Sequence, residues 1–187
     1  HLCGKRVEFE KSKSEELVMW LALHLSQQRR SSARTDMWHA PIKDATFSNI
    51  TSDVRRSLTV AELPPEGQPW LGVTLTDELP LHVGIVSDVE VLRACVNHAR
   101  RWPEDGGIEV VRHGLGLVRG MPFESSLYIW SDSTGLASEA AVLVVRAERF
   151  FDRGAVASDI GCSFLVEARL GRCECGCLRA WRCRSER

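Results

Sequence analysis

The sequence predicts a mainly α-helical protein with two domains: three helices closed by a β-hairpin, and then a segment of stacked helices. Apolar residues recur at helical spacing in three short stretches before residue 60. A turn-rich segment with two strand-like runs follows, and from Asp88 the helical spacing returns for good. With 187 residues and a hydrophobic fraction of 44%, the chain can bury the core that two small domains need.

The first helix is predicted over residues 13–26. Ser12 and Glu15 have the spacing of a capping box, in which two side chains satisfy free N–H groups at a helix start. The helical spacing that follows is carried by Leu17, Val18, Leu21 and Leu25.

Two further helices are predicted before residue 60. Ser32 is a candidate N-cap for residues 33–38, and Asp44 for residues 45–58. Three helices within about fifty residues, the last two joined by a short link that contains proline, are typical of a helix–turn–helix.

A β-hairpin is predicted after the third helix. Residues 70–75 have strand composition and follow a proline-rich turn segment, and residues 79–83 can return as their partner. A hairpin at this place makes a helix–turn–helix winged. An ordinary hairpin in an unrelated mixed domain fits the same composition.

The rest of the chain is predicted to be helical. A helix capped by Ser87 or Asp88 ends near Trp102, and a second runs from Ile108 towards Gly120. Residues 121–130 form a loop, and a longer helix covers residues 134–151. Consecutive antiparallel helices of this kind stack as a repeat array, and we place the domain boundary near residue 86.

The predicted array stops after about three helices, so its last member is expected to leave apolar side chains uncovered. We expect Leu143, Val144 or Phe151 to face solvent or a partner subunit.

The third helix has a buried face and an opposite polar face. Phe47, Ile50, Val54 and Leu58 fall within about 80° of each other on a helical wheel. The candidate DNA-binding residues on the polar side, with Asp53 beside them, are Ser48, Asn49, Ser52, Arg55 and Arg56.

These side-chain types suit a DNA duplex. Asparagine can pair with adenine, arginine with guanine or a phosphate, and serine with either. A solvated polar face explains the same pattern. Residues 29–56 hold six cations against three acids, whereas the whole chain has a net charge of −1, so any DNA site must be local.

Catalysis and cofactors find little support. The histidines are isolated from a nucleophile or metal-ligand partner, and Gly114 and Gly116 lie inside a predicted helix without a preceding strand. We expect no enzymatic activity, no cofactor and no small-molecule substrate.

The carboxy-terminal tail, residues 161–187, is rich in arginine and cysteine. Zinc is one interpretation, but the Cys-x-Cys-x-Cys spacing departs from structural zinc sites, so we expect no metal and a disordered or out-of-frame end. Seven cysteines, an odd number, argue against a disulfide framework.

The location predicted from the sequence is cytoplasmic. No run approaches the roughly 18 apolar residues of a membrane span, and the amino end has no signal-peptide pattern. Because the chain begins with His1, we expect it to be a piece of a longer protein.

Several stretches resemble actinobacterial regulators similar to the Streptomyces antibiotic regulatory protein family. Those that resemble its winged helix are EELVMWLALH at 15–24, DATFSNITSDVRRSL at 44–58, and WLG and LPL at 70–72 and 79–81. Those that resemble the opening of its bacterial transcriptional activator domain are LGLVRGMPFE at 115–124, YIWSD at 128–132 and GLASE at 135–139.

The resemblance implies a response-regulator-type winged helix, with the third helix in the major groove of DNA and the wing near the minor groove. It implies a DNA-binding domain at residues 8–86 and, at 87–160, part of a tetratricopeptide-like activator domain associated with dimerisation and regulation. The chain departs from the family at both ends: its amino-terminal strands are reduced to residues 6–9 at most, and the tail matches nothing expected. The alternative is a protein-interaction scaffold whose winged helix no longer binds DNA.

Overall fold

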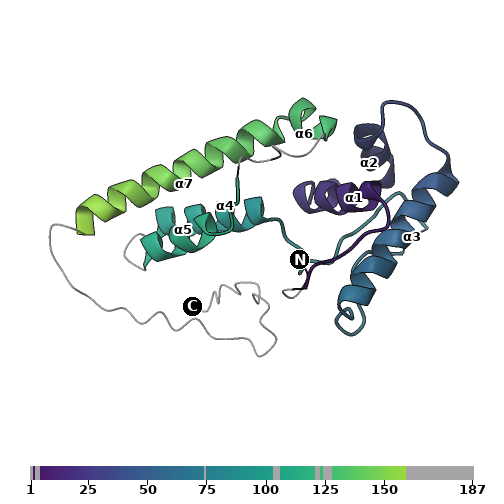
Figure 1. Ribbon diagram of the computed structural model, residues 1–187, viewed down its shortest axis with the longest axis horizontal. Helices are drawn as coiled ribbons and strands as arrows, with labels where there is room; N and C mark the ends of the chain where they lie inside the picture. The colour runs from purple at the N-terminus through teal and green to yellow at the C-terminus, as the bar shows by residue number, and fades with distance from the viewer. Residues whose placement is uncertain are drawn as a thin grey trace. The chain divides into compact units, whose positions relative to one another are not determined.

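The residues that a computed structural model describes are mainly helical, which confirms the mainly α part of the predicted fold class (Figure 1). They are residues 2, 5–73, 75–102, 106–120, 123 and 128–158, with only the backbone described at 129 and 151–158. Their helices are α1 (Ser12–Leu23), α2 (Arg30–Met37), α3 (Asp44–Ala61), α4 (Asp88–Arg101), α5 (Gly107–Leu115), α6 (Ile129–Ser133) and α7 (Leu136–Ser158).

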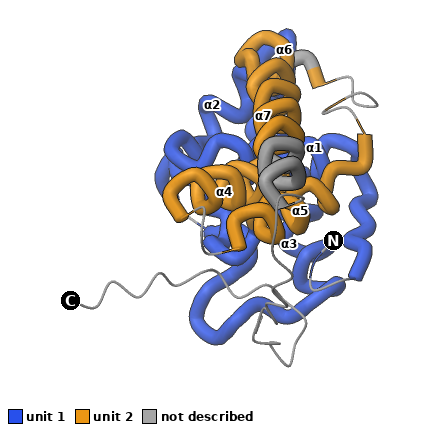
Figure 2. Tube along the Cα trace, turned by 90° about the vertical axis from the view of Figure 1, so that its left-hand side faces the viewer, with its two compact units in different colours: residues 1–85, 169–187 blue, residues 86–168 orange. Residues whose placement is uncertain are grey.

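The described residues fall into two compact units, coloured separately in Figure 2. The first ends at Ile85 and the second begins at Val86, next to the boundary that the sequence suggests. None of the described helices is long and apolar enough to cross a membrane.

The core of the first unit lies where α1 packs against α2 and α3. The predicted stripe of α3 is confirmed, because Phe47, Ile50, Val54 and Leu58 are all buried. The α1 side chains that are buried in this core include Leu17, Trp20 and Leu21, which have no exposed surface. Burying large apolar side chains of this kind stabilises the unit by about 1.5–3 kcal/mol each.

The predicted capping residues of the first unit are wrong. Ser12 is already helical in α1, and Lys11 precedes it without a side-chain capping bond. Asp44 is likewise the first residue of α3, and Ser32 lies inside α2. The start of α2 is satisfied from a distance: Asp77 accepts hydrogen bonds from the backbone N–H of Ser31 at 2.9 Å and from its hydroxyl at 2.5 Å.

Helix α1 ends at Leu23, three residues before the predicted end. The chain turns away here because its next segment pairs with residues that follow α3. Gln28 accepts a backbone bond from Leu79 at 2.7 Å, and Arg30 donates one to Asp77 at 2.7 Å. The Gln28 side chain in turn donates to the carbonyl of Leu21, one of the last in α1, at 3.0 Å.

The predicted hairpin is reduced to one antiparallel bridge, between Leu71 and Leu81. The described residues contain isolated bridges and no strand of two or more residues. Gly72 donates to the carbonyl of Pro80 at 2.8 Å, and His82 donates to the carbonyl of Trp70 at 2.9 Å. The ladder stays short because Pro80 has no N–H to donate. Glycine is needed at position 72, since a Cβ there would lie 2.7 Å from Pro80 Cγ.

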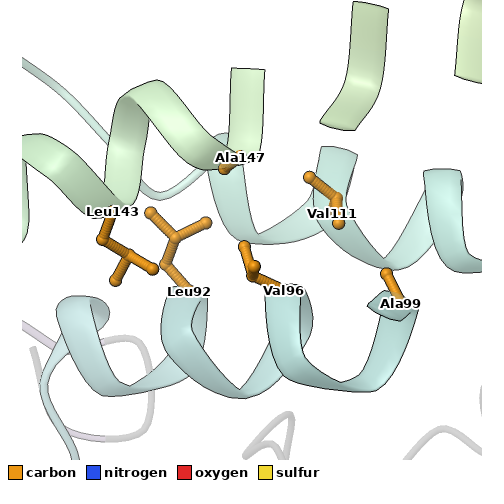
Figure 3. Packing of buried hydrophobic residues seen from close by; sticks show 6 residues of the cluster. All are labelled: Leu92, Val96, Ala99, Val111, Leu143 and Ala147. Carbon is orange, nitrogen blue, oxygen red and sulfur yellow. The ribbon is translucent and has the colours of Figure 1, made fainter. Parts of the chain in front are cut away.

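The second unit is built from α4, α5 and α7, which all pack against each other. Of the two predicted candidates, Ser87 caps α4, because its hydroxyl accepts the N–H of Glu90 at 3.2 Å. Helix α5 ends at Leu115, before its predicted end, and α7 runs past residue 151 to Ser158. The shared core, seen in Figure 3, consists of Leu92, Val96 and Ala99 of α4, Val111 of α5, and Leu143 and Ala147 of α7.

The expectation that α7 exposes Leu143 is wrong. The Leu143 side chain is 9% exposed and belongs to this core, because α4 and α5 together cover that face of α7. Val144 is half-buried against the same cluster, and the Phe151 side chain lies outside the described residues. Among the described side chains of α7, the large apolar ones that are exposed are instead Val142 and Val145.

Two glycines let α4 and α5 approach closely in an antiparallel hairpin. A Cβ at Gly107 would lie 3.1 Å from Ala99, and a Cβ at Gly114 would lie 3.0 Å from Leu92 and 3.1 Å from Cys95. Both distances are shorter than ordinary van der Waals contact. The close spacing of α4 and α5 therefore depends on glycine, which has no side chain, at these two positions.

We expect Gly114→Leu to destabilise the second unit by about 1–3 kcal/mol, because the added side chain overpacks the α4–α5 contact. Gly116→Leu, at an exposed neighbouring position, is the control and should change stability by less than about 0.5 kcal/mol. Hydrogen exchange should show lower protection in α4 and α5 and no change in α1 and α3. Equal protection of α4 in both variants would contradict this packing.

Candidate nucleic-acid interface

Four of the five predicted DNA-contacting residues, all except Arg55, are exposed on α3, and three of them carry no ion pair in the part of the structure that is described. Ser48, Asn49 and Ser52 are all solvent-exposed, and no hydrogen bond recorded among the described residues uses their side chains. They lie within the first three turns of an 18-residue helix whose opposite side is buried in the core. Their amide and hydroxyl groups are therefore available to a ligand.

Arg55 is placed differently. Its half-buried guanidinium turns to the segment after α3 and donates Nε to the carbonyl of Leu71 at 3.2 Å and Nη2 to that of Gly72 at 2.8 Å. Burial, together with the nearby charge of Arg30, lowers the pKa of Arg55 from its ordinary value. Arg55 thus holds the reduced hairpin against α3, and these contacts occupy the side chain that the sequence assigns to DNA.

Arg56 is exposed but lies between two carboxylates. Its Nη2 is 2.7 Å from Asp53 Oδ1 and 2.6 Å from Glu10 Oε2. The hydrogen bonds that Arg56 donates to Asp53 and, with a smaller effect, to Glu10 raise the pKa of Arg56. The three groups together carry a net charge of −1, so a phosphate that approaches this arginine meets competing acids.

Asp53 is buried. The prediction that it lies beside the exposed residues of the polar face is therefore wrong. The residue is 2% exposed, because α1 packs on that side of α3. Its burial raises the pKa of the carboxyl, but the neighbouring Ser14 hydroxyl and the bond and charge of Arg56 outweigh this, so the pKa lies below 3.8. A buried carboxylate needs such partners to stay ionised.

The remaining cations near α2 and α3 differ in their availability. Arg34 is bound to the carboxylate of Asp44 and the carbonyl of Ile42. Arg29 and Lys43 are exposed, and no ion pair found within the described part of the chain includes them. Lys43 directly precedes α3, so its charge lies at the amino end of this helix, the end nearer to Ser48 and Asn49.

The described residues offer no group of three histidine, cysteine or acidic side chains that could hold a metal ion. The cysteine-rich tail lies outside the described residues. The α2–α3 turn borders an open hollow of about 430 Å³, lined by residues that include Trp38, His39 and Ile42. Arg34, which also lines it, is already bound to Asp44 and Ile42.

Nothing matches this chain among protein-family models, curated protein sequences or solved structures.

Sequence reasoning missed the residues that link distant segments. Glu10, Gln28 and Asp77 each contact a partner that is 46 to 53 positions away in the chain. Helical spacing carries no signal for such contacts. The only local hint is that Glu10 and Asp77 lie outside the helices, where polar side chains often satisfy helix ends.

We expect Arg55→Ala to destabilise the first unit by about 1–3 kcal/mol, because it leaves the carbonyls of Leu71 and Gly72 without their charged donor. Urea unfolding measures the loss. Arg29→Ala removes the same charge from an exposed site and serves as the control. If both variants unfold at the same urea concentration, Arg55 does not hold the segment.

Stability should fall as pH drops below about 4. Asp53 and Asp77 have folded pKa values below 3.8, the latter because the Ser31 hydroxyl and backbone N–H donate to it. The unfolded chain therefore binds more protons, so the stability these carboxylates contribute is present above their unfolded pKa and is lost as pH falls through the folded pKa. Urea unfolding between about pH 2 and pH 6 measures the slope. The Asp53→Asn/Asp77→Asn variant should show a shallower slope, and an unchanged one would refute the assignment.

Proposed function

We propose that this chain is a sequence-specific DNA-binding transcriptional regulator. The first unit is its winged helix–turn–helix, α3 is the recognition helix in the major groove, and the helical second unit serves dimerisation or regulation. The observation that carries the proposal is the exposed face of α3, where Ser48, Asn49 and Ser52 have no partner among the described residues while the opposite face is buried. On this proposal the chain works in the cytoplasm and needs no cofactor.

The chain order of the first unit supports a winged helix. A bridge at Arg29 stands between α1 and α2, and it pairs with Glu78 in the segment after α3. That segment continues to Leu81, which pairs with Leu71. Bridged residues in this order, beside three helices, support a winged helix with a minimal sheet.

The dimensions of α3 suit the proposed contact. A helix fits the major groove, which is about 12 Å wide. At a rise of 1.5 Å per residue, Asn49 and Arg56 lie about 10 Å apart along the axis. With Asn49 and Ser52 at the base edges, Arg56 would stand near the phosphates at the groove's rim.

The second unit supports a tetratricopeptide-like interpretation only through its helical hairpin. Helices α4 and α5 pack closely through Gly107 and Gly114, and α7 covers both. Short antiparallel helices packed in this way are the building element of helical repeats. We propose dimerisation for this unit on the resemblance stated above.

The second candidate is a protein-interaction scaffold whose winged helix does not bind DNA. The charges around α3 favour this candidate. Arg55 is bound to backbone carbonyls, and Arg56 faces two carboxylates. The segment after α3 also carries the acids Asp77 and Glu78. Non-specific DNA binding depends on cations that displace counterions from phosphates.

Selection from random duplexes with the full chain decides between the two. We expect enrichment of one sequence, and Asn49→Ala should then weaken binding to that sequence by about 1–3 kcal/mol while leaving random duplex unchanged. Thr59→Ala, also exposed on α3 but nearer its carboxyl end, is the control. Failure to enrich any sequence, with no affinity for random duplex at low salt, would favour the scaffold.

A further inference from the structure

The segment before α1 is tied along the carboxyl half of α3. At one end, Lys5 Nζ lies 2.7 Å from Glu62 Oε2, and at the other Glu10 Oε2 lies 2.6 Å from Arg56 Nη2. Residues 5–11, which we call the strap, therefore run antiparallel to residues 56–62. Val7 and Phe9 of the strap are half-buried, so apolar contacts help to hold it.

The two carboxylates at Arg56 are not equivalent. The Asp53 side chain is 1% exposed and comes from α3 itself, three residues before Arg56, so it holds the guanidinium in place from within. The Glu10 side chain is 66% exposed and comes from the strap. An exposed ion pair of this kind contributes little stability and can be exchanged at low cost.

The carboxylate of Glu10 accepts from Arg56 Nη2 in the way that a phosphate oxygen would. Both recorded contacts of Arg56 use the same nitrogen, Nη2. A phosphate could take the place of Glu10 while Asp53 keeps the side chain oriented. Arginine binds carboxylates and phosphates with the same donor geometry, so the exchange needs no other rearrangement of the guanidinium.

We propose that Glu10 is an internal competitor for DNA phosphate at Arg56, because it holds the Nη2 donor and adds a negative charge that a phosphate on the strap side of α3 must approach. This inference rests on the proposed DNA-binding function. The net charge of the Glu10, Asp53 and Arg56 group is −1 while Glu10 is in place and zero without it. Glu10 therefore weakens binding to any sequence, and it raises the share of affinity that must come from base contacts by Asn49 and Ser52.

The experiment measures the affinity of the full chain for a labelled duplex by fluorescence anisotropy at low and high salt. The probes are the duplex enriched in the selection and a random duplex of equal length. Glu10→Gln is compared with Glu8→Gln, which removes the same charge two residues away at an exposed position. We expect Glu10→Gln to bind both probes about two- to fivefold more tightly than Glu8→Gln at low salt, with the difference shrinking at high salt.

A second background tests whether the gain passes through Arg56. Removing Arg56 alone would leave Asp53 buried without its partner, so the background is Asp53→Asn/Arg56→Gln, with its helicity checked by circular dichroism. In this background, Glu10→Gln and Glu8→Gln should have the same effect. If that background does not fold, Arg56→Lys replaces it and should reduce the extra gain from Glu10→Gln, since lysine cannot hold Asp53 and Glu10 with one planar group.

The outcomes separate the two proposals. Equal affinities of Glu10→Gln and Glu8→Gln, in a chain that binds DNA, overturn the competitor and leave the DNA-binding function standing. An extra gain that persists without Arg56 overturns it as well. No binding of either duplex by the parent chain or by Glu10→Gln overturns the DNA-binding function, and the competitor with it.

Discussion

The contact between Arg55 and the carbonyls of Leu71 and Gly72 is the constraint on which the first unit depends. The segment after α3 has too few backbone bonds of its own to form a stable hairpin, because Pro80 interrupts its ladder. Side chains from outside the hairpin supply what the ladder lacks: Arg55 of α3 holds one arm, and Gln28, between α1 and α2, accepts the N–H of Leu81 on the other at 3.1 Å. The surface of α3 is thereby fixed relative to the segment beside it.

The same segment also completes α2. Asp77 satisfies free N–H and hydroxyl groups at Ser31, as an N-cap would, although it lies 46 residues further along the chain. Helix α2 and the reduced hairpin thus depend on one another. This dependence explains why no local capping residue is needed at the start of α2.

Electrostatics limits what the exposed face of α3 can do. Its base-edge candidates, Asn49 and Ser52, are uncharged, and the arginines beside them are engaged by Gly72, Asp53 and Glu10. Such a surface has little general attraction for phosphates and must gain affinity from specific contacts. Discrimination between duplexes, and not strong non-specific binding, is the property that this arrangement favours.

The sequence by itself determined the helical class, the division near residue 86 and the buried stripe from Phe47 to Leu58, and it narrowed the cap of α4 to Ser87 or Asp88, because each depends on residues within one or two helical turns. Tertiary structure decided the burial of Asp53, the inward turn of Arg55, the pairing of Glu10 with Arg56 and the covering of Leu143. A helical wheel reports the apolar face of one helix, but the width of the buried face depends on what packs against it. Helix α1 widens that face on α3 until it covers Asp53, and the strap reaches Arg56 from outside the helix. Periodicity cannot predict either contact, since both partners are distant in the chain and polar.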